Sequence, residues 1–203
     1  SSLEKATDKK VSDIGDSLIR QTGIPLLTVD AQCAGDRTYV NISQESFPNQ
    51  NQFPASTWTI PVTLAYGNSM EQRKTFVMSN NAVQLELPGC TAVLAGPTGQ
   101  DYYVSNYSAQ SWSDLLAKAQ NFASNKPLLL NIERDAFRLL SVGRITQAQY
   151  DQIKGVLNLP APLLAKAELS QQKMAAVDAG GKEEYPHALR FQGSLKLREN
   201  DKR

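Results

Sequence analysis

Hydrophobic and polar positions divide the chain into three blocks with different periods. From Val11 to Ile19 the apolar residues recur every three or four positions, which is the period of one helix face. Between about residues 24 and 107 they alternate with polar residues in short runs, as in β-strands. From residue 108 onward the helical period returns. The pattern therefore predicts a leading helix, then a region of strands, then a region of helices.

The leading helix has a well-marked end. Gly23 suits the left-handed conformation just past a helix C-terminus, and Pro25 cannot continue a helix. We therefore expect the helix to stop before Gly23 and to pass directly into an extended segment. A single helix ahead of a strand region needs something to pack on, so we assign residues 1–23 to the end of a domain upstream of this sequence.

The clearest strand is residues 56–66, "STWTIPVTLAY", in which Trp58, Ile60 and Val62 alternate with polar positions. Pro61 falls on the polar face and has no backbone N–H. A proline in a strand removes one ladder hydrogen bond, so we expect this strand to lie at a sheet edge or to carry a bulge at Pro61.

About seven short strands are predicted in all, separated by clusters of Gly, Pro, Asn and Ser. Asn80 and Asn81 stand between two of them, and we expect a hairpin there because asparagine tolerates positive φ. This number and spacing of strands predict an approximately antiparallel, seven-stranded β-sandwich. The predicted fold class is thus α+β multidomain, with a helical bundle or solenoid segment after the sandwich.

The helical region contains several predicted helices. The first two have apolar stripes, made of Trp112, Leu115, Leu116 and Ala119 and of Leu129, Ile132, Ala136, Leu139 and Leu140. The third starts at a capping box, because Thr146 and Gln149 can each bond the other's backbone N–H, while Ile145 can pack on Tyr150. A further helical pattern runs from Leu163 to Val177. Short connections between helices are typical of bundles and solenoids.

Residues 99–112, "GQDYYVSNYSAQSW", concentrate aromatic side chains in a chain that has few elsewhere. They could form a stacking surface for a ligand or part of a core. Strand alternation puts Tyr103 and Tyr107 on one face, and Trp112 opens the next helical stripe. We therefore interpret these three residues as core at the junction between the last strand and the first helix after it.

Composition and charge exclude several classes of function. The formal net charge is +1, from 21 basic and 20 acidic residues, which does not favour a nucleic-acid partner. No apolar run approaches the roughly 20 residues that span a bilayer. His187 is the one histidine, so this chain cannot build a multi-histidine zinc site, and it has no Cys-x-x-Cys pair. We expect no catalytic, cofactor-binding or metal-ligating residue in this chain.

The two cysteines, Cys33 and Cys90, each lie at the end of a predicted strand. If those ends are close in space, a disulfide would staple the sandwich and add about 2–4 kcal/mol. The alternative is two free, buried thiols. A disulfide predicts an exported protein, periplasmic or extracellular, whereas free thiols predict a cytoplasmic one.

Five stretches of the sequence, in this order, resemble one protein family. The first three are "RQTGIPLLTV" with Gln21, Gly23 and Pro25, "VNISQESF" with Gln44 and Phe47, and "STWTIPVTLAYG" with Trp58 and Pro61. The last two are "GQDYYVSNY" with Tyr103 and Tyr107, and "ERDAFRLLSVGRIT" with Asp135, Phe137 and Gly143. Together they resemble the β-sandwich and first helices of the aminopeptidase-N-type zinc aminopeptidases, which are gluzincins. Val104 replaces an arginine of the family pattern.

The resemblance implies a non-catalytic C-terminal region of a metallopeptidase, a hydrolase that removes N-terminal residues from peptides. Residues 24–107 would be the β-sandwich domain, residues 108–203 the start of a truncated helical domain, and residues 1–23 the last helix of the missing catalytic domain. In the family, H-E-x-x-H and a further Glu hold zinc, and G-x-M-E-N binds the substrate amine. Neither motif occurs here. Zinc, peptide substrates and catalysis would therefore belong to the catalytic domain, the intramolecular partner.

A second hypothesis comes from another functional class. The same strand pattern suits a free-standing β-sandwich module that binds a carbohydrate or a protein and carries a helical appendage. Sandwich folds host many unrelated functions, so the fold alone cannot separate the two hypotheses.

Overall fold

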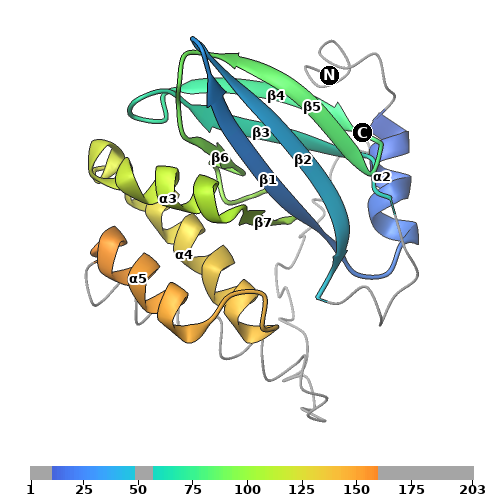
Figure 1. Ribbon diagram of the computed structural model, residues 1–203. Helices are drawn as coiled ribbons and strands as arrows, with labels where there is room; N and C mark the ends of the chain where they lie inside the picture. The colour runs from blue at the N-terminus through green and yellow to red at the C-terminus, as the bar shows by residue number, and fades with distance from the viewer. Residues whose placement is uncertain (1–10, 49–56, 160–203) are drawn as a thin grey trace, which may run out of the picture.

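The computed structural model of the protein describes residues 11–48 and 57–159 (Figure 1). The helix α2 (Val11–Arg20) comes first. The strands are β1 (Ile24–Ala34), β2 (Arg37–Phe47), β3 (Ile60–Tyr66), β4 (Gln72–Met78), β5 (Ala82–Pro88), β6 (Val93–Ala95) and β7 (Val104–Tyr107). The helices α3 (Ala109–Ala117), α4 (Lys126–Ser141) and α5 (Gln147–Leu157) follow, with a 3-10 helix η1 (Ala119–Phe122) after α3. The predicted α+β class is confirmed for the described residues.

The strands form two sheets, with the orders β5-β2-β1-β7 and β4-β3-β6. Most neighbouring strands are antiparallel, but β1 and β7 are parallel, with Leu26 beside Val104 and Val29 beside Tyr107. The expected antiparallel arrangement is therefore wrong for this pair. The chain reaches β7 from β6, which belongs to the other sheet, so no hairpin fixes the direction in which β7 approaches β1.

The predicted hairpin at Asn80 and Asn81 is also wrong. The strands on either side of it, β4 and β5, belong to different sheets, so the chain crosses between sheets at this point. Both carbonyl oxygens of the crossing segment accept hydrogen bonds from Gln44 of β2: Asn81 from its backbone N at 2.9 Å and Asn80 from its side chain at 2.8 Å. Neither asparagine is among the described residues with positive φ.

Pro61 lies in a strand that is central in its sheet but behaves locally as an edge. β3 pairs with β4 along its whole length, with Pro61 beside Val77. It pairs with β6 only from Leu64 to Tyr66. At Pro61, therefore, one side of β3 has no neighbouring strand, and the missing N–H of proline costs no ladder bond there.

The buried side chains form one continuous core that includes both sheets and the helices. Figure 1 places α3, α4 and α5 together below the sheets. Leu26, Leu64 and Leu115 are fully buried in this core, one from each sheet and one from α3. The core thus crosses residues 107 and 108, where we placed a domain boundary. The boundaries themselves stay predictions.

The helix α2 packs on the start of β3, at the right-hand end of the sheets in Figure 1. Ser17 Oγ accepts a hydrogen bond of 2.7 Å from the backbone N of Thr59, and Gln21 Nε2 donates to the carbonyl of Thr57 at 3.1 Å. Ile14 is buried, whereas Ile19 is 84% exposed. This helix therefore has a partner within the chain, while one apolar side chain faces outward.

The helix ends follow the predicted capping chemistry. The capping box of Thr146 and Gln149 is confirmed at the start of α5, and Ile145 and Tyr150 beside it are both buried. Gly143 follows α4 with φ of +71°, the left-handed conformation that favours glycine. The predicted helix of residues 163–177 and His187 lie outside the described residues.

Candidate functional site at the junction of sheets and helices

The aromatic stretch lies where the sheets meet the helices, and three of its four large side chains face inward. Tyr103, Tyr107 and Trp112 are 3%, 5% and 8% exposed. The rings of Tyr107 and Trp112 meet edge to face, with centroids 4.8 Å apart and planes at 70°. Tyr102 points the other way and is 49% exposed. All three residues belong to the buried core where β7 meets α3, and their role at a domain junction stays a prediction.

The two buried phenol groups at the junction differ: Tyr107 Oη is hydrogen-bonded, whereas Tyr103 Oη has no hydrogen-bond partner within the described residues. Tyr107 Oη accepts a hydrogen bond of 3.1 Å from the backbone N of Ala95 in β6. Desolvation raises the pKa of Tyr107, and desolvation followed by the charge of Asp101 raises the pKa of Tyr103. Both phenols therefore stay protonated at neutral pH, where they cannot serve as bases.

A buried carboxylate joins α4 to β7. Asp135 Oδ2 accepts a hydrogen bond of 3.0 Å from the backbone N of Ser105. Asp135 Oδ1 lies 3.4 Å from Arg134 and 3.6 Å from Arg138. Burial raises the pKa of Asp135, and the two guanidinium groups and the Ser105 amide only partly oppose that effect. The carboxylate supplies a partner for a strand N–H that no neighbouring strand satisfies.

Two further residues of α4 hold the loop between β6 and β7. Asn131 Nδ2 donates to the carbonyl of Gly96, and Arg134 Nη1 donates to that of Gly99 at 2.9 Å. Gly99 has φ of +68°, and a Cβ at this position would lie 3.1 Å from Asn131 Oδ1. The close approach of loop and helix therefore requires glycine here. Asn131 and Arg134 were not predicted; Asn131, Asp135 and Arg138 recur at helical spacing, which was the available signal.

The first turn of α3 continues the hydrogen bonding of β1 beyond the end of β7. Ser108 donates its backbone N–H to the carbonyl of Val29 at 3.0 Å, and Ser111 Oγ accepts from the backbone N of Ala31 at 2.8 Å. Ser108 Oγ caps the helix at Ser111 N and also donates to Asp30 Oδ1 at 2.7 Å. Strand β7 and helix α3 are therefore one continuous attachment along the same edge of β1.

The residues that carried the resemblance at the other end of the sheets also meet. Gln44 Oε1 accepts from the backbone N of Trp58 at 3.0 Å, and Gln44 Nε2 donates to the carbonyl of the same residue at 3.0 Å. The glutamine amide therefore pairs with Trp58 as a neighbouring strand would. Phe47, three residues on, is buried and lies beside Ile24 in the register of β1 and β2.

Gly23, Pro25 and Phe137 have structural positions as well. Gly23 has φ of +88° and separates α2 from β1. Pro25 is buried and is the second residue of β1. Phe137 packs on the core edge to face with Tyr150, with ring centroids 5.9 Å apart. These residues therefore shape the fold.

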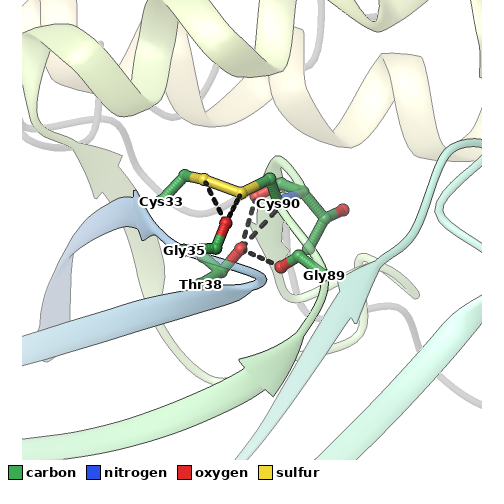
Figure 2. Close-up of a disulfide and its surroundings, with 6 residues drawn as sticks. Cys33, Gly35, Thr38, Gly89 and Cys90 are labelled. Carbon is green, nitrogen blue, oxygen red and sulfur yellow. Dashed lines mark hydrogen bonds between the residues drawn. A yellow bond between two sulfur atoms is a disulfide. The ribbon is translucent and has the colours of Figure 1, made fainter.

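A disulfide joins Cys33 and Cys90, whose Cα atoms are 5.1 Å apart (Figure 2). Cys33 lies near the end of β1, and Cys90 lies in the connection between β5 and β6. Beside the disulfide, Thr38 Oγ1 donates to the carbonyl of Gly89 at 2.7 Å and accepts from the backbone N of Thr91 at 2.9 Å. Thr38 was not among the residues predicted to hold this part of the fold.

The polar side chains at the junction position strands and helices against one another. Over residues 14–48 and 57–159, His, Cys, Asp and Glu side chains do not gather in threes that could hold a metal ion. No described helix combines the length and apolar character needed to cross a bilayer. In comparisons with known proteins, neither a family model nor a curated protein matches this chain.

Proposed function

We propose that this chain is the non-catalytic C-terminal region of a zinc-dependent aminopeptidase. In this proposal residues 24–107 form a β-sandwich that braces the catalytic domain, and residues 108–203 begin a helical cap that limits substrate entry. The helix of residues 1–23 is the last element of the catalytic domain. Zinc and peptide substrates bind to that domain.

One observation carries the proposal: the five stretches that resemble the family contact one another in the fold. Gln44 bonds Trp58 through both ends of its amide. Val29 lies beside Tyr107 in the parallel pair of β1 and β7. The backbone N of Ser105, within the fourth stretch, donates to Asp135 of the fifth. These contacts support the proposal because they join the five stretches within one continuous core.

The nature of these contacts supports a bracing role. Gln44 and Asp135 are buried side chains that pair with backbone groups, and the bond from Ser105 to Asp135 connects a sheet to a helix. Satisfied buried polar networks rigidify a fold and specify one arrangement of its parts. Val104, which replaces the family's arginine, is fully buried beside Leu26, where an apolar side chain needs no polar partner. The departure from the family pattern is therefore compatible with the same frame.

Export follows from the same proposal together with the disulfide. Disulfides persist in oxidising compartments and are rare in the cytosol. We propose a periplasmic or extracellular location. Mass spectrometry of the protein from its native source, alkylated without reduction, should find neither cysteine modified. Alkylation of both would contradict export.

The decisive experiment is to read the coding sequence upstream of Ser1 and to assay the longer product. We expect H-E-x-x-H followed by a further Glu, and zinc-dependent release of N-terminal residues from peptides by the whole protein. The present chain alone, with added zinc, should release none. An unrelated upstream domain, or turnover by the present chain, would overturn the proposal.

A second candidate, a carbohydrate-binding module, has one observation in its favour. A groove of about 700 Å³ borders β2, β4 and β5, with Tyr39, Asn41, Lys74, Gln84 and Glu86 among its lining residues. Tyr39 is 42% exposed and could stack on a sugar ring while its polar neighbours hydrogen-bond the hydroxyl groups. Glycan-array binding that disappears in Tyr39→Ala would favour this candidate, and its absence would remove it.

A further inference from the structure

A groove of about 320 Å³ runs between α3 and α5. Its walls include Trp112 and Leu116 from α3, Gln152, Ile153 and Val156 from α5, and Ile145, which directly precedes the N-cap of α5. Within the described part of the chain, no charged side chain lines it. An uncharged groove of this kind suits an apolar, uncharged face of another element, because a buried unpaired charge is costly.

The chain returns toward the body of the protein directly after α5. Asn158 ends the helix with φ of +42°, the left-handed conformation that reverses chain direction at a C-cap. The next residue, Leu159, is 6% exposed and belongs to the core. One wall of the groove therefore leads straight into residues 160–203, which hold 44 residues of sequence.

The sequence that follows carries a matching apolar stripe. Within residues 163–177, Leu163, Ala167, Met174 and Val177 fall on one helix face together with Ser170. Lys166, Glu168 and Lys173 fall outside this stripe. The stripe is uncharged, as is the groove. A helix of this span is about 22 Å long, and the five residues from 158 to 162 make the short connection that favours an antiparallel neighbour.

The other two segments outside the described ranges have less suitable compositions. Residues 1–10, "SSLEKATDKK", contain five charged residues. Residues 49–56, "NQNQFPAS", have a single large apolar side chain. Neither supplies an uncharged stripe of apolar residues at helical spacing.

We propose that the groove between α3 and α5 is the docking site of residues 163–177, which form an amphipathic helix whose stripe of Leu163, Ala167, Met174 and Val177 fills it. This inference does not depend on the aminopeptidase proposal, because it rests on the groove, the chain direction at Asn158 and the stripe alone. Loss of either proposal would leave the other in place.

Photo-cross-linking in the full chain tests the occupant directly. A benzoylphenylalanine at Gln152, an exposed groove-rim position, should cross-link within one chain to peptides from residues 163–177. The matched control is the same group at Asp151, an exposed residue of α5 that does not line the groove. It should give at least a fivefold lower yield with that segment. Cross-links to a second copy, to residues 178–203 or to no peptide would each overturn the proposal.

Hydrogen exchange gives an independent test that leaves the groove walls intact. Met174→Glu places a charge on the stripe, and Gln172→Glu places the same charge off it. We expect amide exchange in residues 163–177 to be at least tenfold faster in Met174→Glu than in the parent chain, with little change in Gln172→Glu. Exchange in α3 and α5 should confirm that both variants stay folded. Equal exchange in the two variants would overturn the proposal.

Discussion

The two ends of strand β2 are fastened to the rest of the molecule by different chemistry. At the first end, Thr38 is buried, and its hydroxyl holds the connection between β5 and β6 beside the exposed disulfide (Figure 2). At the other end, the Gln44 amide bonds both the start of β3 and the crossing from β4 to β5. Ser17 and Gln21 of α2 add one bond each to the start of β3. The exposed end is held by a covalent cross-link and, in addition, by the hydrogen bonds of Thr38. At the buried end, the Gln44 amide makes three of the hydrogen bonds, so loss of this side chain should be tolerated least.

The largest effect is expected from Gln44→Leu. This change leaves the N–H and carbonyl of Trp58 and the carbonyl of Asn80 without their partner, and each buried unsatisfied group costs about 1–3 kcal/mol. We expect a loss of about 4 kcal/mol in the free energy of unfolding, measured by urea denaturation. Gln44→Glu keeps one acceptor oxygen for Trp58 N and serves as the comparison. A decrease in the free energy of unfolding below about 1 kcal/mol would show that the Gln44 amide does not stabilise this end of β2.

Removal of the disulfide should have the next largest effect. Cys33→Ser with Cys90→Ser opens a cross-link between residues separated by 57 positions, and disulfides closing such loops contribute about 2–4 kcal/mol, mainly by restricting the unfolded chain. We expect about 3 kcal/mol, with near-native hydrogen exchange around Thr38. Rapid exchange of the Thr91 amide in the double variant would mean that Thr38 cannot hold this end alone.

Thr38→Val should be milder while the disulfide is intact. The change removes the hydroxyl bonded to Gly89 and Thr91 but keeps the shape of the side chain, and we expect a loss of about 2 kcal/mol. In the variant without the disulfide, Thr38→Val should lower the free energy of unfolding by about 1 kcal/mol more than this, because neighbouring interactions are energetically coupled. A double-mutant cycle in urea measures the coupling. If the two stability losses are strictly additive, the disulfide and the Thr38 hydroxyl stabilise this end independently.

The residues that hold the two ends of β2 were not equally predictable from the sequence. Val40 and Ile42 are buried on one face of β2, and Thr38 and Gln44 continue the same alternation, so both are polar residues at core positions. This alternation of buried and exposed positions could have identified Thr38 as a buried polar residue, but we did not predict it. Gln44 was found only through the family resemblance. Its partners could not be predicted, because they are backbone groups in connections whose paths depend on the whole fold.

The errors in the strand region have the same physical origin. Asn80 and Asn81 have the composition of a turn, and local composition cannot tell whether the flanking strands pair with each other or with β2 and β3. The parallel pair of β1 and β7 joins Leu26 with Val104 across most of the strand region. By contrast, helix caps depend on four or five consecutive residues, and the capping box of Thr146 and Gln149 was predicted correctly.

Asp135 forms a buried attachment through an ionisable side chain, in contrast to the neutral amide of Gln44. We expect its effect on the free energy of unfolding to be the smallest of those considered. Its pKa is raised by burial, so ionisation of this carboxyl opposes folding. That cost is absent below the unfolded pKa, near about 4, and is complete above the folded pKa. As the pH falls from 7 toward 4, the parent chain should therefore gain stability relative to Asp135→Asn, in which the Ser105 amide keeps an acceptor. The arginine partners stay charged throughout and do not alter the slope. Urea denaturation of both proteins across this range measures the difference. A difference that moves the other way would mean that Arg134 and Arg138 outweigh burial, which would make the charged junction stronger at neutral pH than at acid pH.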